Sequence, residues 1–182
     1  MTASPRPELD ADTLERAHAL FALVRAGDAA TLARLLHMGL VPNLRDAKGD
    51  SLLMLAAYHG HADAVRVLLR HGADPELAND RGQTPLAAAA FKGDLDVARV
   101  LLEHGAQVDG HPQGGRTALM LAAMFDRVGM IDLLLAHGAR PDHCGADTAT
   151  AADLARAMGA TGAAARLARP STSAAAAGAA AG

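Results

Sequence analysis

Hydrophobic and polar positions recur along this chain with a period of 33 residues. The period is marked by two series of glycines, which are Gly49, Gly82 and Gly115, and Gly72, Gly105 and Gly138. Aligned at this spacing, residues 46–78, 79–111 and 112–144 form three full units, and a partial unit lies on each side of them. Self-similarity at a period of this length predicts a tandem repeat of one structural unit.

The first half of each unit predicts a short helix that begins at a hydroxyl residue. Ser51, Thr84 and Thr117 occupy the capping position. Pro85 follows Thr84 at the first helical position, where no backbone N–H is needed. Alanine-rich stretches then follow each cap and keep this helix slim. We therefore expect neighbouring copies to approach closely and to form the concave side of the array.

The second half of each unit predicts another helix, whose apolar residues recur at helical spacing. In the first two full units the expected core positions are Val65, Leu68 and Leu69, and Val97, Leu101 and Leu102. The second series of glycines ends this helix, because glycine adopts the left-handed conformation without the steric cost that other residues bear.

Residues 82–106 read GQTPLAAAAFKGDLDVARVLLEHGA. This segment resembles an ankyrin repeat, whose pattern is G-x-T-P-L-H-x-A-A-x-x-G-H, then a second helix with paired leucines, then G-A-D. The resemblance covers about residues 13–169. It implies an all-α solenoid of stacked helix-turn-helix units with short turn fingers, and a role in binding other proteins without catalysis.

The chain departs from this pattern at two kinds of position. The histidine that follows T-P-L in the family is replaced by Met54, Ala87, Met120 and Asp153. Asp126 replaces the glycine between the two helices of its unit. A left-handed aspartate is strained, so glycine at position 126 is expected to stabilise the fold.

The repeat register predicts three regions. Residues 1–11 and 170–182 are expected to be disordered tails, the second of low complexity. Residues 12–169 form the repeat domain, with an N-terminal capping unit at 12–45, repeats at 46–78, 79–111 and 112–144, and a C-terminal capping unit at 145–169.

Composition excludes several classes of function. The 20 acidic and 17 basic side chains give a net charge of −3, which does not indicate binding to nucleic acid or to an anionic membrane. No uninterrupted apolar run is long enough to span a membrane. One cysteine excludes an internal disulfide and favours the cytoplasm, and arginine in excess of lysine favours a bacterial source. We expect a monomer without cofactor.

Histidines raise the alternative of a metal site. His71, His104 and His137 are repeat equivalents, so the outer two are expected about 20 Å apart, too far to share one zinc ion. Each is instead expected at the end of a second helix, where a positive charge is favourable. A thiol–imidazole site at His143 and Cys144 supports the alternative of an enzyme or metal protein, but no second cysteine or orienting group accompanies it.

The resemblance also implies which residues contact a partner. They are the turn-finger residues and the exposed ends of the first helices, which here are Lys48, Asp50, Tyr58, His59, Asp80, Arg81, Gln83, Phe91, Lys92, Gln113, Arg116, Met124 and Phe125. Three of the four aromatic residues fall in one column of this surface, at Tyr58, Phe91 and Phe125. These rings are either a binding surface or inter-repeat packing. A purely structural assembly module is the remaining alternative, and it would lack a binding hot spot here.

Overall fold

The computed structural model describes residues 11–111, 115–144 and 148–169. The predicted tails at 1–11 and 170–182 lie outside these residues, except that Ala11 already begins the first helix. Within the described ranges the chain forms ten helices. They are α1 (Ala11–Ala26), α2 (Ala29–His37), α3 (Leu52–Tyr58), α4 (Ala62–Arg70), α5 (Pro85–Lys92), α6 (Leu95–Glu103), α7 (Ala118–Met124), α8 (Val128–Ala136), α9 (Ala151–Ala157) and α10 (Thr161–Leu167).

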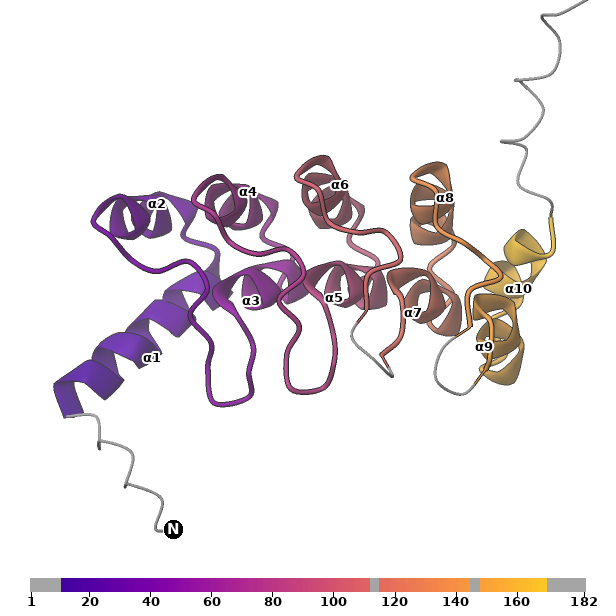
Figure 1. Cartoon of the computed structure of the whole chain (residues 1–182), viewed down its shortest axis with the longest axis horizontal. Coiled ribbons are helices and arrows are strands. Elements are labelled where there is room, and N and C mark those ends of the chain that lie inside the picture. Colours follow the sequence, from indigo (N-terminus) through magenta and orange to yellow (C-terminus); the bar gives the residue numbers. More distant parts are fainter. Residues whose placement is uncertain (1–10, 112–114, 145–147, 170–182) are drawn as a thin grey trace, which may run out of the picture.

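The helices form two parallel rows, and this arrangement confirms the predicted all-α solenoid (Figure 1). One row contains α3, α5, α7 and α9, each in contact with the next, and α1 packs on α3. The other row contains α2, α4, α6, α8 and α10. The segments that connect successive units extend past the first row as turns. We call residues 45–51 the first finger, residues 78–84 the second finger, and the surface made by the fingers and the first row of helices the inner face.

Hydroxyl caps begin the first-row helices, as the sequence predicts. The side chain of Ser51 accepts a hydrogen bond from Met54 N at 3.0 Å, and Thr117 accepts one from Met120 N at 3.2 Å. Thr84 makes the equivalent bond to Ala87 N, with Pro85 at the first helical position. Each cap satisfies one of the N–H groups that have no partner within the helix.

Alanine allows these helices to pack against each other at short range. Fully buried alanine pairs recur at equivalent positions of α3, α5 and α7, namely Ala56 and Ala57, Ala89 and Ala90, and Ala122 and Ala123. The second row supplies the larger core side chains, and Leu68, Leu101 and Leu134 are fully buried on α4, α6 and α8. A single continuous hydrophobic core therefore runs through all the units.

A histidine directly follows each of three second-row helices. His71 and His104 immediately follow α4 and α6, and each ring donates a hydrogen bond from Nδ1 to the carbonyl four residues earlier, at 2.8 Å in both cases. His137 occupies the same position after α8. Carbonyls in the last turn of a helix have few partners within the helix, so this bond gives the imidazole a structural role.

We predict that Thr117→Ala lowers the free energy of unfolding by about 1 kcal/mol, because the cap of α7 is lost in a buried position. Urea denaturation followed by circular dichroism measures the change. Thr161→Ala is the matched control, because Thr161 is an exposed residue in the first turn of α10 whose side chain makes no cap. Equal shifts of the two midpoints would contradict the prediction.

Asp126 makes a contact that its sequence position does not reveal. Its φ of 54° is left-handed, in agreement with its register to Gly60 and Gly93. Its carboxylate, however, accepts a hydrogen bond from Ala163 N at 2.6 Å. Ala160, the residue before α10, has no side chain that can cap the helix, so Asp126 caps it from the preceding unit. The expectation that glycine would stabilise this position is therefore revised, because glycine would remove that cap.

We predict that Asp126→Gly leaves the free energy of unfolding within about 0.5 kcal/mol of the wild type. Relief of left-handed strain and loss of the cap are each worth about 1 kcal/mol and oppose one another. Asp126→Ala loses the cap and keeps the strain, so it should be less stable than the wild type by about 1 to 2 kcal/mol. Urea denaturation midpoints of the wild type and the two variants measure these differences. A glycine variant clearly more stable than the wild type would show that the cap does not contribute to stability.

Candidate protein-binding surface

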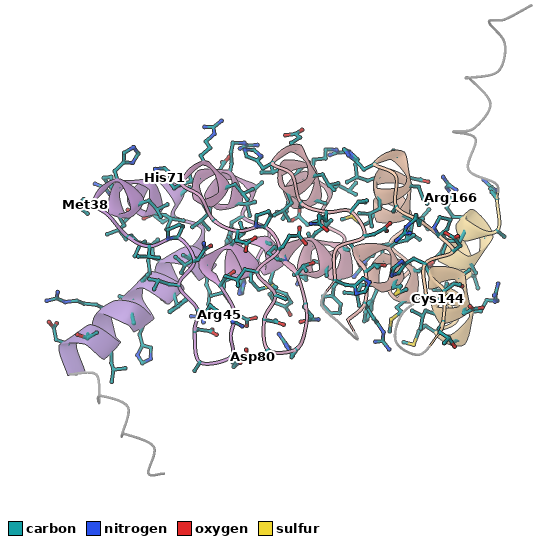
Figure 2. All side chains as sticks on the ribbon, viewed as in Figure 1. Met38, Arg45, His71, Asp80, Cys144 and Arg166 are labelled. Atoms are coloured by element: carbon teal, nitrogen blue, oxygen red, sulfur yellow. The ribbon has the colours of Figure 1, made fainter. Side chains whose placement is uncertain are left out.

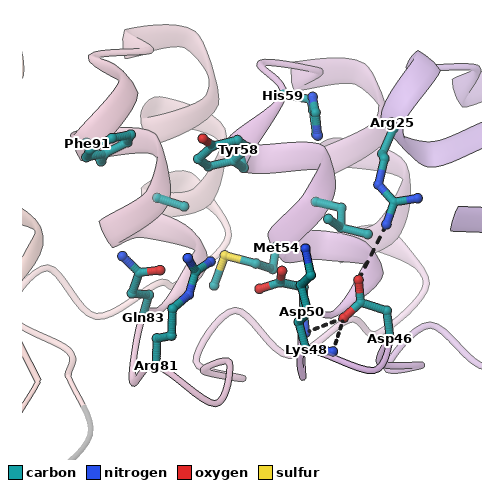
Figure 3. A pocket seen from close by; sticks show the side chains of 12 residues that line it. Arg25, Asp46, Lys48, Asp50, Met54, Tyr58, His59, Arg81, Gln83 and Phe91 are labelled. Carbon is teal, nitrogen blue, oxygen red and sulfur yellow. Dashed lines mark hydrogen bonds and ion pairs between the residues drawn. The ribbon is translucent and has the colours of Figure 1, made fainter. Parts of the chain in front are cut away.

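A groove of about 430 Å³ lies on the inner face, between the two fingers and the C-terminal ends of α3 and α5 (Figure 3). Met54 lies at its centre, with Tyr58 and Phe91 on one side and the finger side chains on the other. The groove is lined by Arg25, Asp46, Lys48, Asp50, Met54, Leu55, Tyr58, His59, Arg81, Gln83, Ala88 and Phe91.

Tyr58 and Phe91 form an aromatic wall of the groove, and Phe125 continues their column beyond it. The rings of Tyr58 and Phe91 are nearly parallel, with centroids 6.3 Å apart, and Phe125 contacts Phe91 edge-on at 4.5 Å. The Nζ atom of Lys92 lies 5.0 Å from the centroid of the Tyr58 ring. Tyr58 is nevertheless 40% exposed and Phe125 37% exposed. The column therefore packs against itself and still presents apolar area to solvent.

The fingers are held by side chains that accept backbone N–H groups. Asp46 Oδ1 accepts from the N–H groups of Lys48 and Asp50, at 2.9 and 3.0 Å. Asn79, its repeat equivalent, accepts in the same way from Arg81 and Gln83 in the second finger. Such bonds fix the turn, and hence the direction of the side chains that it carries.

Hydrogen bonds from two side chains join the fingers to each other. Arg45 donates from one Nη atom to Ala78 O and to Asp80, at 3.1 and 2.9 Å. Asn79 donates to the carboxylate of Asp50 at 2.7 Å, and Asp50 is only 7% exposed. The two fingers are therefore one rigid wall of the groove.

Charge is distributed unevenly around the groove. Its two carboxylates are engaged, since Asp46 also pairs with Arg25 at 3.4 Å and Asp50 accepts from Asn79. Lys48 and Arg81 are exposed, and neither side chain has an ion pair within the described ranges. Burial lowers the pKa of His59, and the neighbouring charges of His61, Arg25 and Lys92 lower this pKa further. Three basic side chains thus line the groove against two carboxylates, although the chain is acidic overall.

Comparison with known proteins agrees with this architecture. A family model described as "Ankyrin repeats (3 copies)" matches residues 20–111 and 72–145. The chain belongs to the ankyrin-repeat family. A curated protein of Pseudomonas aeruginosa that is named for ankyrin repeats is 64% identical over 67 residues, which is 37% of this chain and 39% of that relative. The match thus spans well under half of the relative.

The structure brings together more than half of the expected contact residues of this ankyrin-repeat chain. Those that line the groove are Lys48, Asp50, Tyr58, His59, Arg81, Gln83 and Phe91. Lys92 and Met124 end α5 and α7, Phe125 follows α7 and contacts Phe91, and Arg116 precedes α7. Asp80 is exposed and paired with Arg45. Gln113 lies outside the described residues.

Other lining residues were not expected from the sequence. Arg25 closes the groove from the last turn of α1, and Met54 provides its centre in place of the histidine of the family pattern. The methionine at position 54 could have indicated a lining residue from the sequence, because an unbranched thioether side chain adapts to irregular apolar surfaces. Asp50, expected to contact a partner, has the structural role of joining the fingers as well.

In the structure, His143 and Cys144 contact other residues instead of forming a thiol–imidazole pair (Figure 2 labels Cys144). The His143 ring contacts His111 through their Nε2 atoms at 2.8 Å, and its Nδ1 faces Arg140 at 3.0 Å. Cys144 is exposed, and its Sγ donates to Asp142 O at 3.6 Å. Within the described part of the chain, no three metal-ligating side chains are grouped to hold an ion, and no helix suffices to cross a bilayer.

We predict that Lys92→Gln raises the pKa of His59 towards its ordinary value, because a nearby positive charge that disfavours the imidazolium is removed. An NMR titration of the His59 ring protons measures this pKa. Arg99→Gln on α6 is the control, since Arg99 is not among the charges that act on His59. An unchanged pKa in Lys92→Gln would show that the charge of Lys92 does not contribute to the shift.

Proposed function

We propose that this ankyrin-repeat chain is a non-catalytic module that binds a partner protein across the groove and the finger tips. The observation that carries the proposal is a preformed groove with a partly exposed aromatic wall on one side and exposed cations on the other. Aromatic side chains bury a large area on binding at a small cost in rotamer entropy. The family to which the chain belongs typically has this kind of role.

The contacts at His143 and Cys144 support the non-catalytic part of the proposal. A nucleophilic cysteine needs a base within hydrogen-bond reach, and the base needs a group that orients it. Here the Cys144 sulfur faces a backbone carbonyl, while His143 is engaged by His111 and Arg140. We further propose that the module acts as a monomer and lies in a bacterial cytoplasm; the single cysteine supports the cytoplasm, and the P. aeruginosa relative supports a bacterial source.

We predict that Phe91→Ala weakens binding of the partner by about 2 kcal/mol, or about thirtyfold, because Phe91 lines the groove and is the central ring of the aromatic column. The partner is first captured from a lysate of the native source with the wild-type chain and identified. Its affinity for each variant is then measured by isothermal titration calorimetry, at a temperature where circular dichroism shows every variant to be folded.

Phe125→Ala is the matched control. It removes the same contact between Phe91 and Phe125, but Phe125 does not line the groove. A loss of affinity in Phe91→Ala that clearly exceeds the loss in Phe125→Ala supports the groove as the binding site. Equal affinities for the wild type and Phe91→Ala would assign the column to packing, and would favour a purely structural assembly module.

A further inference from the structure

We propose that the occupant of the groove is an acidic linear segment of the partner protein, which inserts an apolar side chain between the aromatic wall and the fingers. This inference rests on the proposed function, because it specifies the chemistry of the partner at the same surface. It does not follow from the net charge of the chain, which is −3 and would by itself favour a basic partner.

The state of the charges at the groove supports an acidic occupant. The carboxylate of Asp46 accepts hydrogen bonds from Arg25 and from the N–H of Lys48, and that of Asp50 accepts one from Asn79 and is largely buried, so both already face groups of this chain. Asp80, at the tip of the second finger, is paired with Arg45. The exposed cations Lys48 and Arg81 have no such partner among the described residues. Acidic side chains on a ligand would therefore supply the opposite charge that Lys48 and Arg81 do not find within this chain.

The positions of these cations favour an extended segment. Lys48 and Arg81 belong to successive fingers, so a chain that runs across the fingers meets both. Arg116 is the repeat equivalent of Gln83 in the next unit and is also exposed without an ion pair in the described ranges. Two cations at equivalent positions of successive fingers, with Arg116 exposed in the next unit, match acidic residues distributed along a strand or loop.

The centre of the groove favours an apolar anchor in that segment. Met54 and Leu55 line it, with Tyr58 and Phe91 as a wall. A volume of about 430 Å³ lies within the range of natural ligand clefts and admits a few side chains. An aliphatic or aromatic side chain that enters the groove is removed from water, and this burial would favour the complex.

A single-stranded nucleic acid is also anionic and binds to aromatic residues, but it needs free ring faces on which bases stack. The faces of Tyr58 and Phe91 are turned towards each other, with an angle of 12° between the rings, and Lys92 lies over the Tyr58 ring. Contacts on these ring faces leave less room for base stacking than a nucleic-acid site needs. Protein is therefore the occupant that the geometry favours.

Selection from a peptide library tests the chemistry of the occupant directly. A phage-displayed library of random linear peptides is panned on the whole chain, and the selected peptides are synthesised. We expect the selected pool to be enriched in aspartate and glutamate around an aliphatic or aromatic residue. Affinity for the wild type should fall as salt is added, because exposed charge pairs are screened.

Charge reversal then locates the interaction. Lys48→Glu and Arg81→Glu should each weaken binding of the selected peptides by about tenfold or more, since like charges then face each other. Arg99→Glu, an equal change of charge on the outer row, should stay within about twofold of the wild type. Circular dichroism confirms that each variant is folded, and two independent reversal sites keep the test valid if one variant unfolds.

Three results would overturn this inference. Peptides that bind through the groove and lose affinity in Phe91→Ala, but carry no acidic enrichment, would refute the acidic segment and leave the proposed protein-binding function intact. Failure of the library to yield any peptide that depends on Phe91 would refute a linear segment as the occupant. A labelled single-stranded oligonucleotide that displaces the peptides and binds more tightly would identify nucleic acid instead.

Discussion

Close packing between the alanine-rich helices of neighbouring units is the interaction on which the rest of this structure depends. A helix pair of 33 residues has an apolar flank on each side, and it can bury those flanks only against another pair. Fully buried alanines at equivalent positions of α3, α5 and α7 set the spacing at which this burial occurs. The leucines of the second row then fill the remaining volume of one continuous core.

The geometry of the fingers follows from that spacing. Because successive units approach closely, a finger can hydrogen-bond to the next finger rather than to water. Arg45 reaches Ala78 O and Asp80, and Asn79 reaches the buried carboxylate of Asp50. These bonds are made between residues about one repeat period apart, so they form only when the units are correctly stacked. A groove with rigid walls is the result, and rigidity lowers the entropic cost of binding.

The same bonds decide which charges remain available to a ligand. Acidic residues of the fingers are used to hold turns and to join units, whereas Lys48 and Arg81 are left exposed. The chain therefore combines a negative net charge with a groove in which basic side chains outnumber carboxylates. Burial lowers the pKa of His59, and the neighbouring positive charges lower it further. Net charge describes solubility and long-range attraction, but recognition depends on the charges that the fold leaves exposed at the binding surface.

Much of the architecture could be predicted from the sequence because it is encoded locally. Glycine spacing, hydroxyl caps at Ser51, Thr84 and Thr117, and the helical spacing of leucines each depend on a few adjacent residues, and the structure contains the caps and the left-handed glycines that end the second helices. Leu68 and Leu101 are buried as expected, whereas Leu69 and Leu102 are only partly buried against the core. Repetition amplifies these weak local signals, since the same pattern recurs at the same interval. The position of the aromatic column also followed from the register alone.

Contacts between units could not be predicted in this way, because they depend on distances that only the stacked array creates. The sequence showed Asp126 as a strained residue in place of glycine, but the structure shows that its carboxylate also caps α10, 37 residues further on. The sequence predicts Asp50 to be a finger residue that contacts a partner, yet it is buried and hydrogen-bonded to Asn79. The sequence by itself determined where helices begin and end, and which residues share a column. Tertiary structure alone decided which polar groups meet across units, since a hydrogen bond forms only within about 3 Å and local sequence does not specify separations that small.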